Sequence, residues 1–139
     1  MAKIVILIED GFRDEEAVYP YYRLQEAGHR VDLAAKKKGE YHGKFGTPLR
    51  ANKTIDSLKA AQYDGVVIPG GLNAPDKLRM EKKALSFIVA LNKSGKLVAA
   101  ICHGVWLLAS ADILKGRTVT GYRAVKDDIV HAGATYKDT

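Results

Sequence analysis

Cys102 is the only cysteine of the chain, and it lies in the segment Ala100-Ile101-Cys102-His103-Gly104. The apolar run at residues 96–100 predicts a buried strand, and residues 105–109 predict a helix. The thiol therefore falls on a sharp strand-to-helix turn, a nucleophile elbow. Strand and helix crowd each other in such a turn, so the flanking residues must be small, as Ala100 and Gly104 are.

A cysteine at this position is expected to be a reactive thiolate. The N-terminus of the following helix directs free N–H groups and partial positive charge at the sulfur, and His103 adds to this effect. We therefore expect a lowered pKa for Cys102. The alternative is a buried cysteine that only packs, because cysteine is among the most buried residue types. A Cys-His-Gly sequence directly after a strand favours the reactive thiol.

The composition indicates one globular domain, 1–139, because 47% of the residues are hydrophobic and 27% are charged. Residues 1–8 are too few for a signal peptide or a membrane span and predict a buried first strand. The lone cysteine then favours the cytoplasm. The net charge of +6 is scattered, apart from Lys36-Lys37-Lys38, so we expect neither nucleic acid nor a membrane as a partner.

Predicted strands and helices alternate along the chain at short spacing. This pattern predicts an α/β fold with a mostly parallel sheet, helices on both faces and a ligand site at the carboxyl ends of the strands. Residues 36–53 are rich in glycine and predict a hairpin or short strands. The other expected strands are 3–8, 30–35, 64–68, 96–100, 117–120 and 134–136. The expected helices are 14–27, 54–61 with Thr54 as its N-cap, 76–93, 105–109 and 126–132.

Unusual residues follow three of these strands and should converge in space. Acidic residues crowd the segment 9–16 after the first strand, although N-terminal helix capping accounts for Asp14 and Glu15. The strand 64–68 ends in Pro69-Gly70-Gly71, which lets backbone N–H groups approach a ligand as an oxyanion hole requires. A plain tight turn is the alternative there. The third strand end is the elbow.

These segments resemble the PfpI family of intracellular cysteine proteases. Its superfamily also contains the Parkinson-disease-associated deglycase and the class I glutamine amidotransferases. The resemblance implies a flavodoxin-like layered sandwich and spans nearly the whole chain. The matching segments are 16–21 (EAVYPY), 67–71 (VIPGG), 74–79 (APDKLR), 100–104 (AICHG), 121–122 (GY) and 126–129 (KDDI).

The resemblance also implies roles for individual residues. Cys102 matches the family nucleophile, and His103 matches its histidine partner. Glu16 matches the carboxylic acid that hydrogen-bonds the thiolate. Asp76 stands where the family has a glutamate that reaches the histidine of a neighbouring subunit, and it is one methylene shorter. The implied oxyanion and pocket residues are Gly70, Gly71 and Tyr122, with a backbone N–H from His103.

The chain departs from the family pattern at three places. Val105 follows the elbow glycine where proline is common, and Arg13 replaces an acid that is often seen after the phenylalanine. Family chains also continue past the position of Tyr136 with another strand and a terminal helix, whereas this sequence stops at Thr139. We therefore expect either an incomplete sequence or a sheet that lacks an edge strand and its covering helix.

The positions of the histidines fit neither a glutaminase site nor a metal site. The glutaminase branch uses a His-x-Glu pair downstream of the cysteine, whereas His131 is followed by Ala132 and Gly133. His29, His42, His103 and His131 lack the spacing of metal ligands. We expect no metal site and no cofactor.

The sequence thus predicts a cytoplasmic cysteine-nucleophile enzyme that assembles as a homo-oligomer, from dimer to hexamer. As a glyoxalase or deglycase, Cys102 would attack a small dicarbonyl such as methylglyoxal; as a peptidase, it would attack a peptide carbonyl. The alternative is a redox-sensing or chaperone-like stress protein in which Cys102 is oxidised to a sulfinate held by Glu16.

Overall fold

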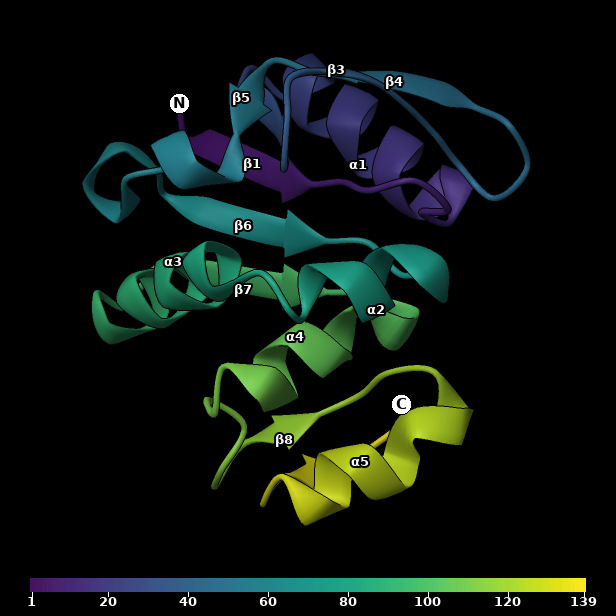
Figure 1. Cartoon of the computed structure of the whole chain (residues 1–139). Coiled ribbons are helices and arrows are strands. Elements are labelled where there is room, and N and C mark those ends of the chain that lie inside the picture. The colour runs from purple at the N-terminus through teal and green to yellow at the C-terminus, as the bar shows by residue number, and fades with distance from the viewer.

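Five parallel strands form the central sheet (Figure 1). A computed structural model describes residues 1–139. The strands are β1 (Lys3–Leu7), β2 (Arg30–Ala35), β5 (Lys53–Thr54), β6 (Gly65–Ile68) and β7 (Leu97–Ala100). Their spatial order is β5-β2-β1-β6-β7, and every neighbouring pair is parallel. The predicted flavodoxin-like α/β fold is therefore confirmed.

Helices cover both faces of this sheet. They are α1 (Asp14–Glu26), α2 (Asn73–Leu78), α3 (Lys82–Lys93), α4 (Val105–Ser110) and α5 (Lys126–His131). The chain also contains four 3-10 turns: η1 (Ile55–Ser57), η2 (Ala60–Gln62), η3 (Cys102–Gly104) and η4 (Arg123–Val125). None of the helices is long and apolar enough to cross a membrane.

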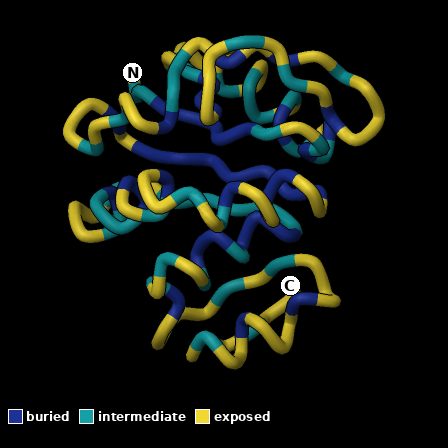
Figure 2. Tube along the Cα trace, viewed as in Figure 1, coloured by how far each residue is buried: buried dark blue, intermediate teal, exposed yellow.

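The side chains of β1 fill two hydrophobic cores, one on each face of the sheet. Ile4 and Ile6 pack in a cluster that includes Ala17 of α1, whereas Val5 and Leu7 pack in a larger cluster with α3, α4 and α5. Successive side chains of a strand point to opposite faces, so a continuous apolar run serves both cores. Figure 2 shows that β1 is buried along most of its length. Each fully buried aliphatic side chain stabilises the fold by about 1.5–3 kcal/mol.

Two small sheets lie outside the central one. Residues 36–53 contain an antiparallel hairpin, β3 (Gly39–His42) with β4 (Pro48–Ala51), as their glycines predict. The strands expected at 117–120 and 134–136 are shorter, β8 (Thr118–Val119) and β9 (Thr135–Tyr136). They pair with each other in parallel and do not join the central sheet.

The single helix expected over 76–93 is wrong, because the chain forms α2 and α3 with a break between them. Leu78 is buried at the end of α2, and a continuous helix would next present Glu81 and Lys82 to the same core. Burying these charges is unfavourable. Glu81 instead takes an extended backbone, and α3 starts a new apolar stripe.

The helix expected over 54–61 is also wrong. Thr54 ends β5, and its side chain caps no helix. The turns η1 and η2 follow, separated by an extended backbone at Leu58 and Lys59. Ile55 is buried in the core, whereas η2 contains no buried residue, so the segment presents no continuous apolar stripe that would stabilise one helix.

β7 lies at the edge of the sheet, which corrects the expectation of a buried strand. It pairs only with β6. Leu97 is 54% exposed, and the other three residues of β7 are only partly buried, although all four are apolar. The elbow that carries the thiol consequently starts from an edge strand.

Candidate functional site

The thiol lies on a strained turn between β7 and α4. Cys102 has a φ of 58°, in the left-handed region that non-glycine residues rarely adopt. The 3-10 turn η3 then leads into α4. An added Cβ at Gly104 would overlap the carbonyl oxygen of Ile68 at the end of β6, so only glycine fits there. The nucleophile elbow predicted from the small flanking residues is thus present, with its strain at the reactive residue.

The carboxyl group of Glu16 reaches this turn from the first turn of α1. The backbone N–H of Gly70 donates a hydrogen bond of 2.6 Å to Glu16 Oε2. An added Cβ at Gly70 would lie 2.6 Å from Glu16 Oε2 and 2.7 Å from Cys102 Cβ. The carboxyl group of Glu16 and the side chain of Cys102 therefore both lie next to Gly70. Gly70 therefore holds Glu16 against Cys102, and its N–H is not free to bind an oxyanion.

His103 lies directly beside the sulfur. Its Nδ1 is 3.2 Å from Cys102 Sγ, the only hydrogen-bonding partner of the ring. The ring packs between Trp106 at 4.8 Å and Tyr122 at 4.9 Å, measured between ring centroids. Trp106 in turn donates a hydrogen bond of 3.0 Å to Asp128. Aromatic packing, rather than a carboxylate, therefore orients the imidazole.

The backbone N–H groups of Gly71 and His103 lower the pKa of Cys102, because they stabilise the negative charge of its thiolate. Gly71 has a φ of 91°, and an added Cβ there would overlap the carbonyl oxygen of Gly11. The close approach of the Gly11 carbonyl oxygen explains why the second glycine of Pro69-Gly70-Gly71 has no side chain. The same pair of N–H groups can hold a developing oxyanion next to Cys102, as expected from the sequence.

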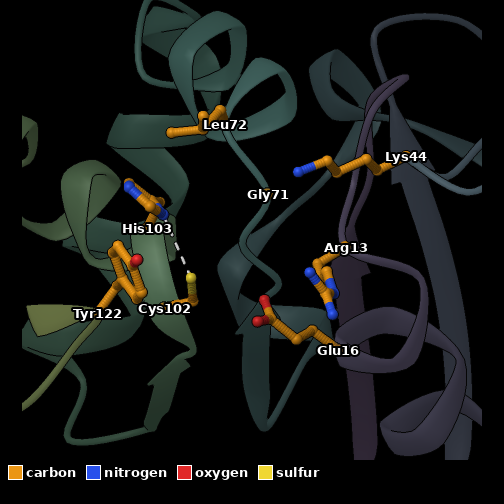
Figure 3. Close-up of a pocket in the computed structure, with 8 residues that line it drawn as sticks. All are labelled: Arg13, Glu16, Lys44, Gly71, Leu72, Cys102, His103 and Tyr122. Carbon is orange, nitrogen blue, oxygen red and sulfur yellow. Dashed lines mark hydrogen bonds between the residues drawn. The ribbon is translucent and has the colours of Figure 1, made fainter. Parts of the chain in front are cut away.

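These groups surround a pocket of about 260 Å³ (Figure 3). The strands β1, β6 and β7 end around it, as expected for a ligand site in a parallel sheet. Its volume suits a small molecule. The pocket is lined by Arg13, Glu16, Lys44, Gly71, Leu72, Cys102, His103 and Tyr122.

The pKa of Cys102 contradicts the lowered value expected from the sequence. Burial raises it, and the nearby carboxylate of Glu16 raises it further, against the opposing effect of the N–H groups of His103 and Gly71. Cys102 therefore needs a base to remove its proton.

Two groups beside the thiol are suited to that task. Burial lowers the pKa of His103, so its imidazole is neutral and can accept a proton near pH 7. Burial also raises the pKa of Glu16, which makes this carboxylate a stronger base than usual. Because Glu16 and Cys102 interact, they titrate as a pair.

The sequence pattern of the DJ-1/PfpI family matches residues 2–139. The chain belongs to this family. A deglycase of Pyrococcus horikoshii is 40% identical over 136 residues, which are 98% of this chain and 81% of that protein. Protein/nucleic acid deglycase 2 of Escherichia coli is 38% identical over 138 residues, 98% of this chain and 80% of that protein. YraA of Bacillus subtilis, whose name suggests a cysteine protease, is 41% identical over 139 residues with the same coverage of 98% and 80%.

Solved structures share the fold. A two-domain protein of Anabaena variabilis, with DJ-1/ThiJ/PfpI-like and ferritin-like domains, matches all of this chain with a TM-score of 0.96 and 38% identity. This chain spans only 40% of that protein. A DJ-1 variant of Schizosaccharomyces pombe matches with a TM-score of 0.90 at 22% identity, over 100% of this chain and 77% of its own. The second likeness shows the fold alone.

The DJ-1/PfpI fold brings together Cys102, His103, Glu16, Gly71 and Tyr122, as the sequence predicts. It leaves Asp76 outside the pocket. Asp76 lies on α2 in a separate hollow with Leu72, Asn73 and Trp106. Within one chain, this carboxylate does not contact His103.

Sequence reasoning did not identify two cations in the pocket, Arg13 and Lys44. The sequence does mark Arg13 as unusual, because a basic residue replaces an acid often seen in the family. It indicates no such role for Lys44, since the turn Gly43-Lys44-Phe45-Gly46 resembles many exposed hairpin loops. Its place in the pocket, on the wall opposite Cys102, depends on a tertiary contact.

Proposed function

We propose that this protein is a cysteine-dependent enzyme that acts on reactive dicarbonyls and their amine adducts, as a glyoxalase or deglycase. One observation carries the proposal: Cys102 Sγ faces two candidate bases, His103 and Glu16, and two N–H donors in a small pocket. The deglycase names of several relatives support it. The single free thiol favours a reducing compartment such as the cytoplasm.

In the first step, Cys102 Sγ attacks the aldehyde carbon of methylglyoxal and forms a C–S bond. The thiol proton passes to Nδ1 of neutral His103, which lies 3.2 Å from the sulfur. The former carbonyl oxygen gains the electron pair of the C=O bond and is held by the N–H groups of Gly71 and His103. Protonation of this oxygen gives a hemithioacetal.

In the second step, Glu16 or His103 moves a proton from the aldehyde-derived carbon to the neighbouring ketone carbon through an enediol. The product is a lactoyl thioester of Cys102, formed without any net oxidation. Water then cleaves the C–S bond and releases lactate and the free thiol. The overall conversion is methylglyoxal plus water to lactate. With a hemiaminal adduct as substrate, the C–N bond breaks and the amine leaves with a proton, which regenerates the aldehyde that Cys102 then attacks.

Peptide hydrolysis is the second candidate, and the name of YraA supports it. A peptide is less electrophilic than an aldehyde, and its leaving amine must be protonated by a histidine that a carboxylate orients. Asp76 can supply this carboxylate only to a neighbouring subunit, because it lies outside the pocket of its own chain. The peptidase proposal therefore requires a homo-oligomer.

Both activities are tested on one preparation, with methylglyoxal and a fluorogenic peptide as substrates and Cys102→Ala as the control. We expect lactate formation that disappears in Cys102→Ala, and weaker peptide cleavage. Robust Cys102-dependent peptide cleavage without lactate would reverse this ranking. If both activities are absent, the redox-sensing alternative gains support, and intact mass after mild peroxide then reports whether Cys102 takes up two oxygens as a sulfinate.

A further inference from the structure

Two cations line the pocket on the wall that faces the cysteine. Arg13 precedes α1, and Lys44 lies in the loop between β3 and β4. In Figure 3 the Lys44 side chain extends from the right-hand wall toward the space in front of Gly71, whereas the Arg13 side chain lies lower on the same wall, with its guanidinium near Glu16. The proposed reaction uses neither of them. Both lie near the ring of Phe45, with Arg13 Cζ at 5.1 Å and Lys44 Nζ at 5.6 Å from its centroid.

Both cations retain unused hydrogen-bonding capacity. Lys44 has no carboxylate within the 4.0 Å of an ion pair. Arg13 donates from Nε to Glu15 at 2.8 Å, which leaves its two terminal nitrogens without a protein partner. Glu16 is the only carboxyl group that lines the pocket, and it is held by Gly70 against Cys102. The wall formed by Arg13 and Lys44 is therefore positively charged.

The loop that carries Lys44 is held in place by a buried carboxylate. Asp14 accepts hydrogen bonds from the backbone N–H groups of Phe45 at 2.9 Å and Thr47 at 3.0 Å. The N–H of Lys44 itself donates to the carbonyl oxygen of Phe12 at 2.8 Å. These three bonds pin the backbone of the hairpin tip to the start of α1, next to Arg13, so the two cations project from neighbouring points of the pocket wall.

We propose that Arg13 and Lys44 form an anion-binding wall that selects substrates with a carboxylate or phosphate group near the reacting carbonyl. The substrate class is an α-oxo aldehyde, or its adduct, with an anionic group a few bonds from the aldehyde carbon. The guanidinium supplies paired donors and the ammonium a point charge, a combination suited to anionic oxygens. This substrate class rests on the proposed function, whereas the anion-binding wall is a property of the pocket.

The wall can be tested without turnover, by alkylation of Cys102. Iodoacetate and iodoacetamide have nearly the same size, and only iodoacetate is an anion. Each forms an S–C bond as iodide leaves, so the fraction of thiolate cancels in the ratio of their rates. We expect this ratio to exceed that of glutathione, to fall about threefold in Arg13→Gln or Lys44→Gln, and to fall about tenfold in the double variant.

Controls separate the wall from the overall charge of the protein. Lys59→Gln removes an exposed lysine before the amino end of β6, away from the site, and should leave the ratio unchanged. Added salt should lower the ratio of the wild type toward that of glutathione, because salt screens exposed charges. A wild-type ratio equal to that of glutathione, or one that Lys44→Glu does not change, would overturn the proposal.

A second experiment addresses the substrate. The kcat/KM for 4,5-dioxopentanoate should exceed that for its neutral methyl ester, and the preference should fall in Lys44→Gln. A high alkylation ratio with no turnover of either compound would support the wall while refuting the proposed function. Equal kcat/KM values would overturn the substrate class.

A third experiment compares how well two anions protect Cys102 from alkylation. Better protection by inorganic phosphate than by propionate would assign the wall to phosphate-bearing substrates, and the reverse order would assign it to carboxylates.

Discussion

Replacement of Gly104 by alanine should destabilise the protein, although the backbone there is helical. Gly104 has φ −57° and ψ −25°, a conformation that alanine adopts without strain. At such a position, Gly→Ala ordinarily stabilises a protein by about 0.4–1 kcal/mol, because alanine restricts the unfolded chain. The sign of the change therefore tests whether the elbow has room for a methyl group.

The structure places the methyl group against atoms that have little freedom to move. The added Cβ would overlap the carbonyl oxygen of Ile68 and lie 3.1 Å from that of Pro69. The Ile68 oxygen accepts a hydrogen bond of 3.0 Å from Ile101, which holds it between β6 and the elbow. Overpacking of this kind costs about 1–3 kcal/mol. At roughly 4 °C per kcal/mol for a chain of this size, the Tm should fall by about 4–12 °C.

Thermal unfolding followed by circular dichroism measures this change. Gly116→Ala is a comparison without a collision, because nothing lies within 4 Å of its added Cβ, although its φ of 76° adds a strain that Gly104 lacks. That variant carries only the left-handed strain, about 1–2 kcal/mol, and no collision. A Tm for Gly104→Ala at or above that of the wild type would refute the steric account of the elbow.

Three further changes probe the site and its supports. Gly70→Ala should lower lactate formation about a hundredfold, because its Cβ would lie 2.6 Å from Glu16 Oε2 and displace that carboxyl; activity within twofold of wild type would contradict this placement. Burial and the Glu16 carboxylate raise the pKa of Cys102, so Glu16→Gln should shift the midpoint of alkylation against pH to lower pH. An upward shift would show that Glu16 instead donates a proton to the thiolate. Burial alone would raise the pKa of Asp14, but hydrogen bonds from Thr47 and Phe45 lower it, so Asp14→Asn should cost about 1–3 kcal/mol near pH 7. Urea unfolding should show the two proteins converging as the pH falls below the folded pKa of Asp14, and a difference that persists in acid would refute the assignment.

The features that the sequence predicted correctly depend on local sterics. The segment around Cys102 indicates an elbow because a strand, a thiol and Gly104 follow one another within a few residues. The convergence of Glu16, Pro69-Gly70-Gly71 and Cys102 follows from one further rule, that parallel strands end at the same edge of a sheet. Neither inference requires knowledge of long-range packing.

The incorrect predictions concern features set by tertiary contacts. The apolar sequence of β7 is compatible with a central or an edge strand, and only the strand order shows that Leu97 is exposed. No glycine or proline marks the break between α2 and α3. The break arises because the residues that a continuous helix would bury after Leu78 are charged. The position of Lys44 depends on Asp14, 30 residues earlier in the chain.

The thiol pKa shows most clearly how such contacts change the chemistry. A cysteine before a helix predicts a stabilised thiolate, but burial and the charge of Glu16 act in the opposite direction, and no local pattern shows their size. The same burial keeps His103 neutral at 3.2 Å from the sulfur. In the reaction we propose, the pocket therefore holds a thiol beside its base, and proton transfer to that base accompanies attack on the carbonyl.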